Sequence, residues 1–396
     1  MPDFYREALE QMNVLTGYRR DFHRHPELSR KEFRTAARIE EELDALGIPH
    51  SRVDETGVYA ELRGEKGDGP VVVLRADIDA LPIQEETGME YASQNDGVMH
   101  ACGHDMHTAS LLYAARELAR RKEEFGGTVR FFFQQAEEIG YGARQFIAAG
   151  HLKGADRVFG LHTAPDLPLG QVGVKLGSNN ASVDYFKIKV HGRAAHVSTP
   201  NLGADALFIA AQTVVAIQAI VPRRTSPIDS VLIGIGKLTA GTAYNIVAEE
   251  AELEGTTRLF TPELRRYVNE QVEKVAKATA AMYGGEAEVE WVDFAAPVIN
   301  PADICREVSA EVTAMLGEDA LRTDRALSCG GDNFADFQQY VPGVYAYVGV
   351  QSEDTPGSCG PLHNSHYNID ERALPIGGAL YVRMAWRWLV TDPPKA

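Results

Sequence analysis

The chain has 396 residues, enough for two domains, since a domain typically takes about 100 to 200 residues. Hydrophobic residues make up 44% and charged residues 24%, which excludes a mostly disordered chain. The net charge of −17 repels polyanions and argues against nucleic acids and anionic membranes as partners.

The N-terminal residues are charged and mixed, so we expect no signal peptide. No apolar run reaches the roughly 18 residues of a membrane span, and the longest, 204–221, is broken by Asp205 and two glutamines. The cysteines are few and widely spaced, which is typical of a reducing compartment. We therefore expect a cytoplasmic protein.

The N-terminal half alternates between segments typical of helices and of buried strands. Apolar residues at helical spacing around Pro26 predict two helices, and short apolar runs next to glycines predict strands. This order predicts an α/β domain with a mostly parallel sheet flanked by helices. The predicted elements are two helices within 19–46, a strand at 71–74, a helix at 108–121, a strand at 129–133, a helix at 143–149 and a strand at 157–161.

The pattern changes at about residue 179, where apolar and polar residues begin to alternate with period two. Such strands predict a small α+β domain with one exposed sheet face, inserted at 179–292. The segments 1–178 and 293–396 then form the first domain together. The later predicted elements are strands at 185–190, 231–238, 251–259 and 344–350, and helices at 205–221, 262–282, 302–316 and 374–389.

The densest group of reactive side chains directly precedes the predicted helix at 108–121. Three histidines, a cysteine and an aspartate lie within His100-Ala-Cys102-Gly-His104-Asp105-Met-His107. Loops after strands are where α/β folds place ligands, and Cys-Gly-His lets a thiolate and an imidazole reach one metal ion. The alternative is a helix start capped by Asp105, with the histidines at the surface.

Further carboxylates and histidines follow other predicted strands. Asp77 and Asp79 follow the first strand, and Glu137 and Glu138 follow the next, where adjacent carboxylates favour a cation. His162 lies in another strand. Other histidines are ambiguous from the sequence alone: His363 and His366 lie in a C-terminal loop, His196 follows a strand of the inserted domain, and His23 and His25 are interpreted as structural.

With these residues in view, the chain resembles the metal-dependent aminoacylase and carboxypeptidase amidohydrolases, in the branch with hippurate hydrolase and indole-acetyl-amino-acid hydrolases. The resemblance covers nearly the whole chain, in the family's order. The matching segments are 19–29, 75–82, 100–105, 134–138, 160–162, 362–363 and 369–375.

The resemblance implies a catalytic α/β domain with two divalent metal ions and an inserted ferredoxin-like lid domain that forms a homodimer. It implies that Glu137 is the general base, that Asp79 orients a ligand, and that His196 polarises the scissile carbonyl across the dimer. Asn245 and Arg258 match positions that hold the substrate carboxylate. The implied metal ligands are Cys102, His104, Glu138, His162 and His363.

The chain also departs from the family's motifs. Gly330-Gly-Asp-Asn-Phe334 replaces Gly-Ser-Glu-Asp-Phe, Val-Ser-Thr-Pro-Asn follows His196, and Ser365 replaces a proline. Asp77 stands where other branches have a ligand histidine, and His366 is an extra candidate. These departures concern the substrate pocket more than the metal site.

We therefore expect hydrolysis of the amide bond of N-acyl-L-amino acids with zinc, manganese, cobalt or nickel. One alternative is a dipeptidase or carboxypeptidase on the same metal centre. Two others are a catalytically silent metal-binding protein and a metal-independent hydrolase with Cys102 as nucleophile.

Overall fold

The computed structural model describes residues 2–394, which divide into two compact units. Among the described residues, the first comprises 2–177, 299–326 and 333–394, and the second comprises 178–298 and 327–332. The second unit extends beyond the expected 179–292 because its last strand pairs Ala295 with Val183, and because the Ala181 N–H donates to the Ser328 carbonyl. No helix in the described part of the chain is long and apolar enough to cross a membrane.

The first unit is built on an eight-stranded sheet of order β1-β2-β4-β3-β5-β14-β6-β13. Its centre, β4-β3-β5-β14, is parallel, while β1-β2, β2-β4 and β14-β6 are antiparallel. The strands are β1 (His50–Val53), β2 (Gly57–Arg63), β3 (Val71–Asp77), β4 (Thr128–Gln134), β5 (Arg157–Pro168), β6 (Val172–Gly173), β13 (Leu321–Arg322) and β14 (Gly343–Gln351); β7 (Gly177–Asn180) and β12 (Val298–Asn300) form a separate two-stranded sheet.

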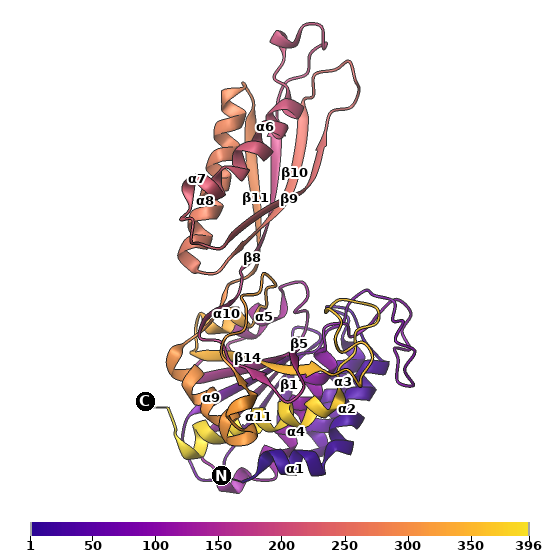
Figure 1. The fold of residues 1–396 in the computed structure, drawn as a ribbon, viewed down its shortest axis with the longest axis vertical. Coiled ribbons are helices and arrows are strands. Elements are labelled where there is room, and N and C mark those ends of the chain that lie inside the picture. Colours follow the sequence, from indigo (N-terminus) through magenta and orange to yellow (C-terminus); the bar gives the residue numbers. More distant parts are fainter. Residues whose placement is uncertain (1, 395–396) are drawn as a thin grey trace. The chain divides into compact units, whose positions relative to one another are not determined.

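Helices cover both faces of this sheet, as the central apolar strands require. Figure 1 shows α4 and α11 on one face and α5 and α10 on the other. The helices of this unit are α1 (Phe4–Glu10), α2 (Met12–Arg24), α3 (Phe33–Ala45), α4 (His104–Ala119), α5 (Gly142–Ala148), α9 (Ala302–Leu316), α10 (Phe334–Gln338) and α11 (Leu374–Trp386). The predicted mostly parallel α/β domain is confirmed, although β1 and β2 were not predicted.

The second unit is an antiparallel sheet of order β11-β8-β10-β9. Alternate residues of β8 and β10 are buried, and α6 and α8 pack on the buried face, as the period-two pattern predicts. Strand β11 was not predicted. The elements are β8 (Val183–His191), α6 (Ala206–Gln218), α7 (Ile220–Arg224), β9 (Val231–Ala240), β10 (Glu250–Leu259), α8 (Pro262–Met282) and β11 (Glu286–Ala295).

Candidate metal centre

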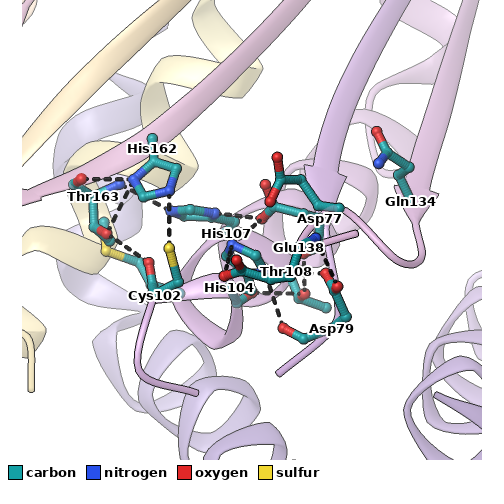
Figure 2. A network of polar contacts seen from close by, with 12 residues as sticks. Asp77, Asp79, Cys102, His104, His107, Thr108, Gln134, Glu138, His162 and Thr163 are labelled. Atoms are coloured by element: carbon teal, nitrogen blue, oxygen red, sulfur yellow. Dashed lines mark hydrogen bonds and ion pairs between the residues drawn. The ribbon is translucent and has the colours of Figure 1, made fainter. Parts of the chain in front are cut away.

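The clusters predicted from the sequence meet at one edge of the central parallel sheet. Glu138 follows the carboxyl end of β4, and His104 begins α4. β3 pairs with β5 only as far as Arg75 and Gly160, so His162 lies just past the end of that pairing. Figure 2 shows that these side chains, with Cys102, point toward a common region. Parallel topology therefore gathers residues that are distant in sequence.

Five predicted ligands lie within reach of shared ions. The Cys102 Sγ atom is 3.5 Å from His162 Nε2, and Glu138 Oε1 is 3.8 Å from His104 Nε2 and 3.4 Å from His363 Nε2. The ligand atoms of Cys102, His104 and His162 all lie within 4.8 Å of one another, as do those of Cys102, Glu138 and His363. Two overlapping groups that share one thiol suit two neighbouring ions.

The chemistry of these donors fits divalent cations. His104 Nε2 and Glu138 Oε1 are buried and make no hydrogen bond to any described residue, which is costly unless something else binds them. Burial and the nearby Glu138 carboxylate raise the pKa of the Cys102 thiol well above its usual value, so a cation is needed to hold a thiolate there. Burial lowers the pKa of His162, which keeps its imidazole neutral, as a ligand must be.

Backbone carbonyls orient His104 and His162, the two buried histidines predicted as ligands. The His104 Nδ1–H donates to the Asp79 carbonyl oxygen at 2.9 Å, and the His162 Nδ1–H donates to the Thr163 carbonyl oxygen at 2.7 Å. Each bond leaves the Nε2 lone pair free to bind an ion. The Asp79 carboxylate is also 3.2 Å from His104 Nδ1.

Asp77 and His107 also lie near His104, but their polar atoms have other partners. The Thr163 N–H donates to His107 Nε2 at 2.9 Å, so Nδ1 carries the proton and donates to Asp77 Oδ1 at 2.5 Å. Asp77 Oδ2 accepts from Arg75 at 2.7 Å. Both oxygens are therefore hydrogen-bonded, and they connect Asp77 to Arg75 and His107. The sequence pattern assigned no role to Arg75, and it placed His107 only among the three histidines before the predicted helix at 108–121.

Asp77 remains ionised despite complete burial. Burial alone would raise the pKa of its carboxyl, but His104, Arg75 and His107 outweigh that effect and hold the pKa well below its usual value. The resulting buried ion pair with Arg75 joins strand β3 to the rest of the site, because Arg75 also donates to Gln134 and Asn333.

Glu137 lies beside the ligands without being one of the five. Its side chain is 6% exposed, and its carboxylate lies in a group with His104 and Glu138. The Asn333 N–H points to Glu137 Oε1 at 3.4 Å. This location places a buried carboxylate next to the predicted ligands.

The remaining histidines differ in whether they lie near the predicted ligands. The His363 side chain is half exposed and reaches Glu138, whereas His366 lies by Ser365 and Glu86, outside every described ligand group. The extra candidate His366 is therefore not a ligand in this arrangement. His23 is buried between Asp105 and Glu85, in agreement with its structural interpretation.

The other predicted site residues belong to the second unit. His196 and Asn245 are exposed and lie on paired segments, because the Val197 N–H donates to the Asn245 carbonyl oxygen at 3.1 Å. The Ser198 N–H donates to His196 Nδ1 at 3.1 Å, which places the ring proton on Nε2. Arg258 lies on β10 and donates to Thr256, and it forms no ion pair with a described carboxylate.

Comparison with known proteins identifies a family and close relatives. The model of peptidase family M20/M25/M40 matches residues 73–387. An N-acetylcysteine deacetylase of Bacillus subtilis (strain 168) is 40% identical over 94% of this chain and 96% of its own length. The IAA-amino acid hydrolase ILR1-like 4 of Arabidopsis thaliana is 33% identical over 95% of this chain and 86% of its own.

A solved structure supports the same relationship. The crystal structure of the YXEP protein of Bacillus subtilis, described as a dinuclear metal binding peptidase from the M20 family, is 38% identical to this chain. It superposes with a TM-score of 0.81 over 94% of this chain and 97% of its own. Both the sequence and the fold are thus shared along almost the whole length.

Proposed function

Because the chain belongs to peptidase family M20/M25/M40, whose members are metal-dependent amidohydrolases and peptidases, we propose that it hydrolyses the amide bond of N-acyl-L-amino acids. The convergence of Cys102, His104, Glu138, His162 and His363 around Glu137 carries this proposal. The names of the deacetylase and of the IAA-amino acid hydrolase support the substrate class.

The five ligands are proposed to hold two divalent ions, with Cys102 shared between them. The thiolate, imidazole and carboxylate donors suit zinc, and also manganese, cobalt or nickel. When bound, such ions supply the Lewis acidity that makes water a nucleophile near neutral pH.

Glu137 is proposed as the general base. Its carboxylate accepts the proton of the attacking water and donates it to the leaving amide nitrogen, which lets the free amino acid depart. Its burial and the hydrogen bond from the Asn333 N–H restrict the carboxylate to one region beside the ligands.

Three residues of the second unit are proposed to contact the substrate. His196 carries its proton on Nε2 and so presents a donor suited to the developing oxyanion, a contact worth roughly 3 to 4 kcal/mol. Arg258 lacks an ion-pair partner among the described carboxylates and suits the α-carboxylate, with Asn245 as a neutral donor.

The second unit also supports the proposal of a homodimer. β9 is an edge strand whose Leu232 and Leu238 are exposed, and α6 exposes Phe208 and Val215. An unpaired strand edge beside exposed apolar side chains is suited to pairing with a second copy. Light scattering on the purified protein tests the dimer.

We also propose a cytoplasmic location, which the four free cysteines support.

The test of function is a substrate panel of N-acetyl, N-benzoyl and indole-acetyl amino acids beside plain dipeptides, before and after chelation and after addition of each metal. We expect N-acyl amino acids to be cleaved, activity to disappear on chelation and metal to restore it. Preference for dipeptides would favour the peptidase alternative. Activity that survives chelation but is lost in Cys102→Ser would instead indicate a cysteine nucleophile.

A matched variant tests the base. Glu137→Gln keeps the size of the side chain, and we expect it to bind two ions and lose at least a hundredfold in kcat. Full activity of this variant with both ions bound would refute the role of Glu137.

A further inference from the structure

The turn that carries Glu137 has an unusual backbone. Ala136, directly before it, has φ 51°, in the left-handed region that residues other than glycine rarely adopt. The Tyr141 N–H donates to the Ala136 carbonyl oxygen at 3.0 Å, and the Gly140 N–H donates to the Glu137 carbonyl oxygen at 2.8 Å. These bonds close the turn after Ala136, while the Ala136 N–H is bonded outside it.

Glu32 supplies that outside partner from 104 positions earlier in the chain. Its Oε1 atom accepts the Ala136 N–H at 2.8 Å. The side chain is 0% exposed, and Oε2 makes no hydrogen bond to any described residue. A buried carboxyl with an unsatisfied oxygen is unfavourable in itself, so its contribution lies in the bond that Oε1 makes.

A second carboxylate holds the other side of Glu137. Asp79 Oδ2 accepts the Glu138 N–H at 3.1 Å and the Ser29 hydroxyl at 2.7 Å. The backbone N–H groups on both sides of Glu137 are therefore bonded to fixed, buried carboxyls. Burial and the Asp79 carboxylate raise the pKa of Glu32 to about 7, as expected if both acids face the same turn.

We propose that Glu32 is a positioning residue for Glu137. By accepting the Ala136 N–H, it keeps the backbone in its left-handed conformation and so fixes the place of the Glu137 carboxylate. This inference rests on the proposed role of Glu137 as general base. Displacement of a reacting group by about 1 Å can cost roughly a hundredfold in rate, so a lost restraint on this turn has a measurable effect.

Glu27 offers a matched control on the same segment. Its carboxylate accepts the Arg34 N–H at 3.1 Å and the Thr35 N–H at 2.8 Å at the start of α3, away from the turn. Glu32→Ala removes the acceptor for Ala136, Glu32→Gln keeps an acceptor oxygen, and Glu27→Ala removes two backbone bonds from the same helix start.

Steady-state kinetics on the best N-acyl amino acid of the panel give the first test. We expect Glu32→Ala to lower kcat at least tenfold, with KM within threefold and two ions per chain. Glu32→Gln and Glu27→Ala should stay within threefold of the wild type. The proposal would be overturned if the kcat of Glu32→Ala stayed within threefold of the wild type, or if Glu27→Ala lost as much kcat as Glu32→Ala.

Hydrogen exchange gives a test that does not depend on activity. In the metal-free and the metal-loaded protein, Glu32→Ala should speed exchange in peptides covering 134–140 at least tenfold, and Glu27→Ala should not. Unchanged exchange there would also overturn the proposal. A fully active Glu137→Gln would instead refute the proposed function, while the exchange data would still report whether Glu32 restrains the turn.

Discussion

The ionisation of Glu32 predicts an unusual dependence of stability on pH. Burial and the Asp79 carboxylate raise its pKa from the ordinary 4.5 to about 7. Between these values the folded state binds more protons than the unfolded state, so the contribution of Glu32 to stability falls as the pH rises. Glu32→Gln cannot ionise and should lack this loss.

The size of the effect follows from the two pKa values. At about 1.36 kcal/mol per pH unit, an interval from 4.5 to about 7 corresponds to at most about 3 kcal/mol. Most of this loss occurs between pH 5 and pH 8. We therefore expect Glu32→Gln to be about 2 to 3 kcal/mol more stable relative to the wild type at pH 8 than at pH 5.

Urea unfolding of the metal-free proteins at pH 5, 6, 7 and 8 measures this difference. Chelator in every sample removes the separate pH dependence of metal binding. Fluorescence and circular dichroism should both be followed, since two units can unfold in separate steps. Parallel stability curves for the two proteins would refute the reasoning and place the pKa of Glu32 near its ordinary value.

Three further predictions concern the metal centre and the substrate. Zinc binding to the metal-free protein at pH 7 should release protons from both Cys102 and His104, because the pKa of each group is raised well above its usual value. Calorimetry in buffers of different ionisation enthalpy measures this release, and Cys102→Ala should lower it by about one proton. Asp77→Ala leaves the buried Arg75 charge without its partner and should lower the free energy of unfolding by about 3–5 kcal/mol. An unchanged free energy of unfolding would show that the ion pair does not contribute to stability. Arg258→Ala should raise KM roughly tenfold to a hundredfold for substrates with a free α-carboxylate and leave their amides unaffected, as a paired assay would show.

Much of the fold could be predicted because the signals are local. Thr261 caps α8 and Pro262 begins it, so its bounds of 262–282 are those predicted. β5 was predicted to end at residue 161 but continues to Pro168, because β14 pairs with it there. β11 was not predicted from the sequence. It is an edge strand that contains several glutamates, so its sequence lacks the apolar character on which the other strand predictions were based.

The candidate site was predictable where ligands cluster in sequence or follow strands. Residues that act through tertiary contacts gave no such signal. Glu32 is one of several glutamates near α3, and only the fold brings it to Ala136. The sequence left the role of Asp77 open, and only the structure shows Arg75 and His107 at its two oxygens.

The order of the ligands along the chain has a consequence for how the protein matures. Cys102, His104, Glu138 and His162 all precede the second unit in the sequence, and His363 follows it. During synthesis, four of the proposed ligands therefore leave the ribosome before the second unit, and the fifth leaves only after it. The nascent chain therefore has an incomplete set of proposed ligands until His363 has emerged, so full metal loading waits for the segment that follows the second unit.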